Sequence, residues 1–146
     1  GRLRASMTRH GGAPAPPPER GPRGRGAAPV SVRLRFEEDA RIGPGKVALL
    51  EAVERTGSIS AAGREMGMSY RRAWLLIDSL NRIFETPAVE ARPGGVHGGG
   101  AALTPLGHEL VLAYRAMEAD ATLAVERHFA ALRTRMVAPS RRASDA

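Results

Sequence analysis

The side chains best suited to binding or chemistry gather in one short stretch, GSISAAGREMGMSYRRAW, between Gly57 and Trp74. It contains several serine hydroxyls, the adjacent arginines Arg71 and Arg72, and the single tryptophan of the chain. An arginine fork binds phosphate oxygens, or both acceptors on the major-groove edge of a guanine. These residue types therefore favour recognition of nucleic acid over catalysis.

Patterns typical of enzymes and metal sites are missing from the sequence. There is no cysteine, which excludes disulfides, thiolate zinc sites and cysteine nucleophiles. The histidines His10, His97, His108 and His128 form no ligand-spaced pair, and no carboxylate pair or nucleophile and base stand at a recognisable spacing. We therefore expect no enzyme, no catalytic residue, no cofactor and no metal site.

The net charge of +7 lies mostly near the start of the chain, where residues 1–31 hold six arginines against Glu19. Residues 1–30 are rich in Pro, Gly and Arg and too poor in large apolar groups to fold, so we predict a disordered basic arm. Such an arm either attracts phosphates without sequence preference or is simply solvated. The apolar runs are far shorter than the roughly 18 residues that span a bilayer, so we expect a cytoplasmic protein without a membrane partner.

After the basic arm, the spacing of apolar residues predicts a strand and then a helix. Val32, Leu34 and Phe36 alternate with arginines, which is typical of a short strand with one buried face. A helix with apolar residues at helical spacing follows, beginning at Pro44 and ending just before Gly57. Proline suits a first helical turn, and glycine suits the residue that follows a helix.

Two further helices are predicted in the stretch that holds the arginines. Ser58 or Ser60 caps a short second helix, and Gly67 provides the positive φ that a turn needs. Ser69 caps the third helix, which we expect to run to about Glu85. The two helices form a hairpin with a tight turn.

The last elements are a wing and a long helix. The segments AVEAR and AAL flank PGGVHGGG, which predicts two short strands joined by a glycine-rich loop. Thr104 caps a helix that begins at Pro105 and continues without a breaker to Met136. The predicted fold is mainly α: a winged helix-turn-helix domain at residues 31–103 with a short amino-terminal strand, a long dimerisation helix at 104–136, and a disordered tail at 137–146.

The third helix has the layout of a DNA recognition helix. A helical wheel places its apolar side chains on one face and Arg71 on the opposite face. Ser69, Arg71 and Arg72 crowd the amino-terminal turn, where such helices contact bases and phosphates. We assign Arg71 to a base and Arg72 to a phosphate. The alternative is an ordinary helical hairpin in which both arginines are merely solvated.

The remaining candidate DNA contacts are aromatic residues and the wing. For Trp74, a partly buried ring that anchors the helix is favoured over a base contact, because indole has one donor and a large apolar body. In the wing, glycine amides approach a phosphate, unless the loop makes no contact. The predicted DNA-binding residues are Ser58, Ser60, Ser69, Tyr70, Arg71, Arg72, Trp74, Arg92, Gly94, Gly95 and His97.

The long helix carries an apolar stripe that the preceding small domain cannot cover, since residues 104–136 extend about 48 Å at about 1.5 Å per residue. Self-association as a homodimer would cover it, and would present two recognition helices to two half-sites. The alternative is a helix that folds back or breaks between Glu118 and Thr122. The predicted dimerisation residues are Leu110, Tyr114, Met117, Val125, Phe129 and Leu132.

The segments GPGKVALLEAVERTGSISAAGREMGMSYRRAWLLIDSLN and VEARPGGVHGGGAALTPLGHELVLAY carry a family resemblance. They resemble the amino-terminal DNA-binding domain of the ModE-type molybdate-responsive regulators and, more distantly, LysR-type regulators, over about residues 32–135. SYRRAW and the glycine wing are its most specific parts. The resemblance implies a dimeric winged helix-turn-helix repressor or activator, with Ser69 to Arg72 on the recognition helix. ModE-type proteins continue into a molybdate-binding region that this sequence lacks, so we expect no built-in molybdate sensor.

The sequence therefore predicts a transcriptional regulator that binds a palindromic operator in double-stranded DNA as a homodimer. A second class remains open: a protein-interaction module, or a DNA-binding subunit that acts with a separate effector-sensing protein. Loss of DNA binding on Arg71→Ala with dimerisation intact would favour the first class.

Overall fold

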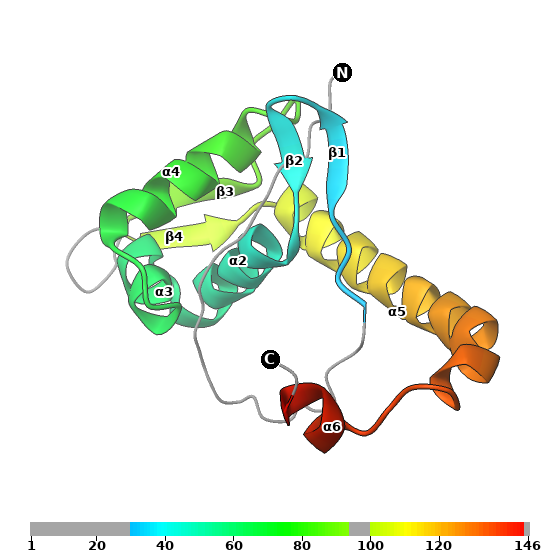
Figure 1. The fold of residues 1–146 in the computed structure, drawn as a ribbon. Coiled ribbons are helices and arrows are strands. Elements are labelled where there is room, and N and C mark those ends of the chain that lie inside the picture. The colour runs from blue at the N-terminus through cyan, green and yellow to red at the C-terminus, as the bar shows by residue number, and fades with distance from the viewer. Residues whose placement is uncertain (1–29, 94–99, 145–146) are drawn as a thin grey trace.

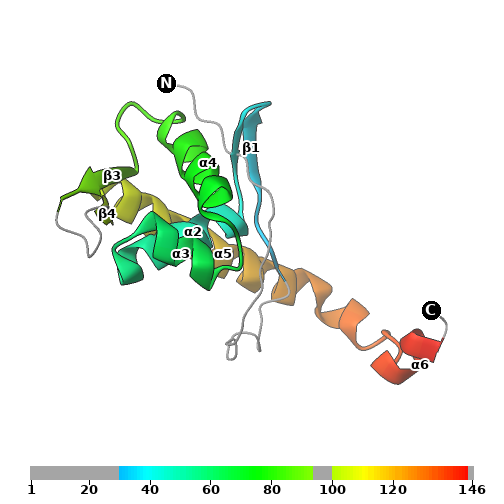
Figure 2. The ribbon, with the colours of Figure 1, turned by 90° about the vertical axis from the view of Figure 1, so that its left-hand side faces the viewer.

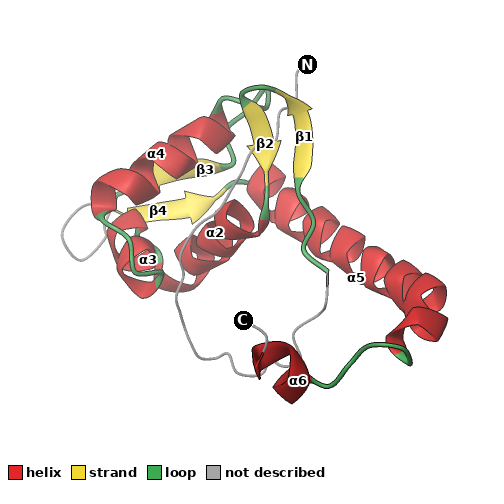
Figure 3. Cartoon of the chain, viewed as in Figure 1, coloured by secondary structure: helices red, strands yellow, loops and turns green. Residues whose placement is uncertain are grey.

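The structure, a computed structural model, describes residues 30–93 and 100–144 of the chain (Figures 1 and 3). In chain order the elements are β1 Leu34–Glu37, β2 Ala40–Ile42, α2 Pro44–Thr56, α3 Ile59–Glu65, α4 Tyr70–Asn81, β3 Val89–Arg92, β4 Gly100–Leu103, α5 Pro105–Arg133 and α6 Pro139–Ser144. This is a mainly α winged helix-turn-helix fold with a long carboxy-terminal helix, as the sequence predicted. The predicted disorder of residues 1–30 falls, except for Val30, on residues outside the described part.

Where one amino-terminal strand was expected, the structure has an antiparallel hairpin of β1 and β2. Leu34 pairs with Ile42 and Arg35 with Arg41, and the register shifts beyond Arg35. The shift ends the alternation, so Phe36 is 57% exposed and its predicted place on a buried face was wrong. The buried apolar side chains of the hairpin come instead from β2, which the sequence analysis did not predict.

Helix α2 is the centre of the core and has the predicted bounds. Five of its apolar side chains are fully buried: Val47, Leu49, Leu50, Ala52 and Val53. Gly57 ends the helix with φ 75°, and its N–H donates to the carbonyl of Val53 at 2.8 Å. This left-handed conformation favours glycine, which confirms the predicted stop.

Helix α3 begins at the first of the two candidate caps, because Ser58 Oγ accepts from the N–H of Ala61 at 3.0 Å. Gly67 adopts φ 73° in the turn that leads to α4, as predicted. The two helices cross closely, since a Cβ added to Gly63 would lie 3.0 Å from the Cβ of Ala73. Small residues at the crossing allow the tight turn of the hairpin.

Helix α4 ends at Asn81, earlier than the predicted Glu85. The side chain of Asn81 is engaged with the chain beyond the helix: its Oδ1 accepts from the N–H groups of Ala88 at 2.8 Å and Val89 at 3.1 Å. Its Nδ2 donates to the carbonyl of Val89 at 3.2 Å. These bonds fix the start of β3 against the end of α4, so the chain turns before residue 85.

The wing consists of β3 and β4, whose antiparallel register runs from Val89 opposite Leu103 to Arg92 opposite Gly100. The N–H of Ala101 donates to the carbonyl of Gly57 at 2.9 Å, which ties β4 to the turn before α3. The two predicted strands are confirmed, and the wing stands beside α3 and α2 (Figure 2).

Helix α5 is continuous from Pro105 to Arg133, so the alternative of a break between residues 118 and 122 was wrong. Thr104 caps it as predicted: its Oγ1 accepts from the N–H of Gly107 at 3.1 Å and donates to the carbonyl of Pro87 at 2.7 Å. The start of the helix packs in the core, and the remainder projects away from the domain (Figure 1). In the described residues, no helix is long and apolar enough to cross a membrane.

The tail predicted as disordered contains a short helix, α6, at residues 139–144. Pro139 supplies a fixed φ at its start. The N–H groups of Arg141 and Arg142 donate to the carbonyl of Ala138 at 3.0 and 3.2 Å and close the turn. The helix is closed by local backbone hydrogen bonds and not by burial of an apolar face, so the apolar pattern of the sequence did not predict it.

Candidate nucleic-acid interface

An open groove of about 1260 Å³ lies between α3 and α4 on one side and the wing on the other. Among the residues that line it are five of the predicted DNA-binding residues: Ser58, Ser60, Tyr70, Trp74 and Arg92. They come from the hairpin and from β3, which are far apart in the sequence. The fold therefore brings the two predicted halves of the site to one surface.

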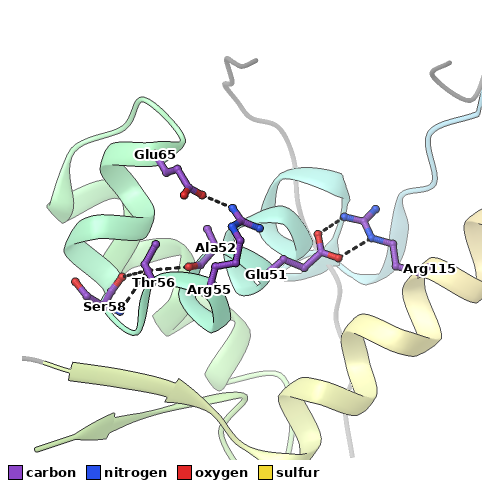
Figure 4. A network of polar contacts seen from close by, with 7 residues as sticks. All are labelled: Glu51, Ala52, Arg55, Thr56, Ser58, Glu65 and Arg115. Carbon is purple, nitrogen blue, oxygen red and sulfur yellow. Dashed lines mark hydrogen bonds and ion pairs between the residues drawn. The ribbon is translucent and has the colours of Figure 1, made fainter. Parts of the chain in front are cut away.

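Ser58, which caps α3, is held by local hydrogen bonds (Figure 4). The N–H of Ser58 donates to Thr56 Oγ1 at 3.3 Å, and Thr56 Oγ1 donates to the carbonyl of Ala52 at 2.8 Å. Since Ser58 Oγ already accepts the capping bond, its hydroxyl proton remains to donate into the groove. Ser60 is exposed two residues further on, and its Oγ accepts from Arg64 Nη1 at 3.5 Å.

Arg71 and Arg72 lie at the amino-terminal turn of α4, exposed and beside the groove rather than in its lining. Within the described residues, neither side chain has a hydrogen bond or an ion pair. By contrast, Arg55 pairs with Glu65, and Arg82 pairs with Asp78 at 2.5 Å. Two arginines without acidic partners are therefore available to an anion at the tip of this helix.

The backbone adds to this positive potential at the start of α4. Ser69 Oγ accepts from the N–H of Arg72 at 3.1 Å, which satisfies one of the donors of the first turn. The other first-turn N–H groups of a helix have no partner within the helix, and the helix dipole is positive at this end. Together with Arg71 and Arg72, this turn has the donors and the charge that a phosphate or a guanine edge requires.

Tyr70 and Trp74 form an aromatic wall one helical turn apart on the groove side of α4. Tyr70 is 56% exposed and Trp74 is 45% exposed. Half of the indole therefore packs against the domain, as an anchoring ring would, and the other half faces the groove. Apolar surface of this kind suits contact with sugars or thymine methyl groups.

The wing contributes both signs of charge. Arg92 is exposed at the end of β3, next to the loop, whereas Gly94, Gly95 and His97 lie outside the described residues. Glu90 is also exposed on the groove side of β3, and it would repel a phosphate. Two further lining residues face each other, with His108 Nδ1 3.2 Å from Glu54 Oε2.

Several groove residues were missed from the sequence: Glu54, Arg64, Glu90 and His108. Arg64 had a signal, because it follows Ser60 by four residues and so lies one turn along the same helix. His108 and Glu54 had none, since they meet only through the packing of α5 on α2. Within residues 30–93 and 100–144, no group of three or more metal-binding side chains could hold a metal ion.

The predicted dimerisation residues divide into two groups along α5. Tyr114 belongs to the core: its side chain is fully buried, and its Oη donates to the carbonyl of Val32 at 2.5 Å. Burial, and then the charge of Glu118, raise the pKa of Tyr114 to about 12. Leu110 and Met117 are half-buried against the same core. Tyr114 therefore cannot contact a partner directly, which corrects its assignment.

The second group lies beyond Met117, where α5 contributes no residue to the core of the described chain. Val125 and Phe129 are half-buried and Leu132 is 49% exposed. At 100° per residue these side chains continue the face that carries Tyr114. The apolar stripe thus leaves the domain with no partner among the described residues.

Comparisons with known proteins show a family model that matches part of this chain. The model of the bacterial regulatory helix-turn-helix proteins of the LysR family matches residues 45–108, from the first turn of α2 to the first turn of α5. This range holds the whole hairpin and the wing.

Three relatives are informative. The molybdenum-pterin-binding protein MopB of Rhodobacter capsulatus is 55% identical over 80 residues, which cover 55% of this chain and 30% of that protein. The molybdenum transport protein ModE of Azotobacter vinelandii is 42% identical over 82 residues, which cover 56% of this chain and 30% of that protein. The DNA-binding transcriptional dual regulator ModE of Escherichia coli (strain K12) is 34% identical over 87 residues, covering 60% and 33%.

The chain spans about a third of the length of these relatives. None of the three is named as an enzyme. Residues 45–108 are thus similar to the bacterial regulatory helix-turn-helix proteins of the LysR family, and two of the three relatives with a matching segment are named ModE.

Proposed function

We propose that the protein is a transcriptional regulator that binds double-stranded DNA in a sequence-specific manner. The observation that carries the proposal is the pair Arg71 and Arg72 at the tip of α4 beside the groove, neither of which has a side-chain partner among residues 30–93 and 100–144. A relative named as a DNA-binding transcriptional regulator has a matching segment. The site of action would be the cytoplasm, where bacterial DNA lies.

In this proposal α4 enters the major groove with its amino-terminal turn leading. Arg71, on the face opposite the core, reads a guanine, while Arg72 and the first-turn amides bind phosphate. Arg92 on the wing contacts the backbone beside the groove, with Gly94, Gly95 and His97 as further wing contacts. Tyr70 and Trp74 lie against sugars or thymine methyl groups.

The protein acts as a homodimer through the distal part of α5. The apolar stripe through Val125, Phe129 and Leu132 supports this, since burial against a second copy would remove it from water. Charge supports it too. Residues 105–126 hold four acidic side chains against Arg115, whereas residues 127–142 hold five arginines and no acidic side chain. Two copies of α5 in opposite directions would bring these unlike charges together.

In an alternative proposal, the chain uses the same DNA interface but acts as a DNA-binding subunit together with a separate effector-sensing protein. In both settings α4 and the wing contact DNA. They differ in whether the purified chain alone selects an operator.

Alanine substitutions test the proposed roles. Arg71→Ala should cost about 1–3 kcal/mol on a selected operator and relax its preference at one base position. Arg72→Ala should weaken binding to all sequences alike and lower the salt slope by about one. The control is Arg41→Ala, because Arg41 lies on β2 and its Nε donates to the carbonyl of Glu38 in the hairpin turn. Equal DNA binding by all three variants would show that α4 does not recognise the DNA sequence.

A further inference from the structure

At the last turn of α5 that contacts the domain, Arg115 and Glu118 form a charged cluster with Glu51 of α2, and Figure 4 shows the contact of Arg115 with Glu51. Arg115 donates to both carboxylate oxygens of Glu51 on α2, from Nε at 3.0 Å and from Nη2 at 2.5 Å. Its Nη1 donates to Glu118 at 2.7 Å. We call Glu51, Arg115 and Glu118 the Arg115 clamp. It joins the central helix of the DNA-binding domain to the long helix.

The clamp is better suited to fixing an orientation than to stabilising the fold. The side chains of Arg115, Glu51 and Glu118 are 38%, 30% and 23% exposed, and ion pairs near solvent contribute little free energy of unfolding. A bidentate arginine–carboxylate pair, however, fixes the orientation of the guanidinium plane relative to the carboxylate plane. Burial alone would lower the pKa of Arg115, but the hydrogen bond and charge of Glu51 raise it, so the guanidinium stays charged.

Because the clamp lies where α5 leaves the domain, a small change in its geometry would displace the distal end of α5 by a large distance. The neighbouring bond from Tyr114 to Val32 is on the same turn, and no residue beyond Met117 joins the core of the described chain. From Arg115 to Leu132 the helix rises about 26 Å at about 1.5 Å per residue. A tilt of about 10° at the clamp would therefore move the distal end by about 4.5 Å, more than the roughly 3.4 Å between base pairs.

We propose that the Arg115 clamp fixes the direction in which α5 leaves the DNA-binding domain, and thereby sets the half-site spacing that the dimer accepts. This inference rests on the proposed function for its DNA consequence. Arg115 is then a positioning residue, which contacts no DNA and leaves the reading of each half-site to α4.

Its geometrical part is tested without DNA. The chain has no cysteine, so spin labels can be placed at Glu85→Cys and Glu126→Cys, two exposed positions on the domain and on distal α5. Labelled chain is mixed with a tenfold excess of unlabelled chain, so that only distances within one chain are measured by pulsed electron resonance. The distance distribution should be narrow, and should broaden or shift by several ångströms in Arg115→Met. An unchanged distribution would overturn the proposal.

The functional part is measured on duplexes that carry the selected half-sites at the selected spacing, or with one or two base pairs added or removed. The unsubstituted chain should prefer one spacing at least tenfold. In Arg115→Met this preference should fall below threefold, while affinity for an isolated half-site changes less than twofold. A spacing preference retained in full would contradict the clamp.

A double-substitution cycle separates the clamp from a general loss of charge. Glu51→Gln, Arg115→Met and the two combined should relax the spacing preference to the same extent, because either change breaks the same contact. Arg41→Met, which removes one arginine outside the clamp, should leave it intact. If the unsubstituted chain binds no paired half-sites, the proposed function fails, and the spin-label distances still decide the clamp.

Discussion

Gly107, in the first turn of α5, lies directly against the backbone carbonyl of Ala88, the residue before β3. A Cβ added to Gly107 would lie 2.2 Å from that oxygen. The carbonyl of Ala88 also accepts from the N–H of Thr104 at 2.9 Å, so it cannot easily move aside. The contact of α5 with the start of β3 thus positions the wing. This close contact requires a residue without a side chain at position 107.

Gly107→Ala should therefore destabilise the domain. Alanine is the better helix former by about 1 kcal/mol, yet the backbone clash should lower the free energy of unfolding by about 2–4 kcal/mol. Ala113→Gly, at an exposed position of the same helix, should cost about 1 kcal/mol through helix propensity alone. Urea unfolding measures both. A Gly107→Ala chain as stable as the unsubstituted chain would mean that the close contact is not maintained in solution.

Asn81 should prove essential to the junction of α4 and the wing. Asn81→Ala removes the acceptor of the Ala88 and Val89 N–H groups, and unpaired buried donors cost about 1–3 kcal/mol each. We expect a loss of about 2–3 kcal/mol in the free energy of unfolding. Ser79→Ala serves as the control, because Ser79 Oγ donates to the carbonyl of Leu76 within the same helix. Equal effects of the two substitutions would argue against this role.

Tyr114 should make the protein sensitive to alkali. Its pKa is raised from 10.0 to about 12 by burial and then by Glu118, so the folded chain keeps a proton that the unfolded chain loses above pH 10. Stability from this group is complete below pH 10 and falls as the pH rises towards 12, by about 2 kcal/mol. Thermal unfolding of Tyr114→Phe should lack this decline, whereas exposed Tyr70→Phe should retain it. A decline in Tyr114→Phe equal to that of the unsubstituted chain would contradict the assignment.

Distal α5 should carry the dimer contact on one face. Phe129→Glu places a charge in the apolar stripe, and should raise the dimer dissociation constant at least tenfold in sedimentation experiments. Leu123→Glu is the matched control, because Leu123 is 61% exposed and lies on the opposite face of the same helix. Equal weakening by both substitutions, or by neither, would exclude this stripe as the interface.

The starts of α3, α4 and α5 and the end of α2 could be predicted from the sequence because local chemistry fixes them. Ser58, Ser69 and Thr104 each accept a backbone N–H as caps, and Gly57 and Gly67 adopt the positive φ that their residue type allows. These interactions span at most a few residues, so the residue type at one position suffices to place them.

The features that were mispredicted depend on contacts across the chain. The end of α4 is determined by Asn81 bonding to residues seven and eight positions later. Tyr114 continues an apolar stripe, and the pattern alone cannot distinguish a contact with Val32 of the same chain from a contact with a second copy. For the same reason, the Arg115 clamp had no signal in the sequence, since Glu51 is 64 residues away.

The central claim is that this chain reads a DNA sequence through α4. The most direct measurement is selection of bound fragments from a random DNA pool by the purified protein, followed by titration of the winner against salt. We expect a palindromic motif bound at least about 10³ times more tightly than bulk DNA at physiological salt. Enrichment of no motif, with weak binding that disappears as salt rises, would mean that phosphate attraction alone was measured and that α4 does not read sequence.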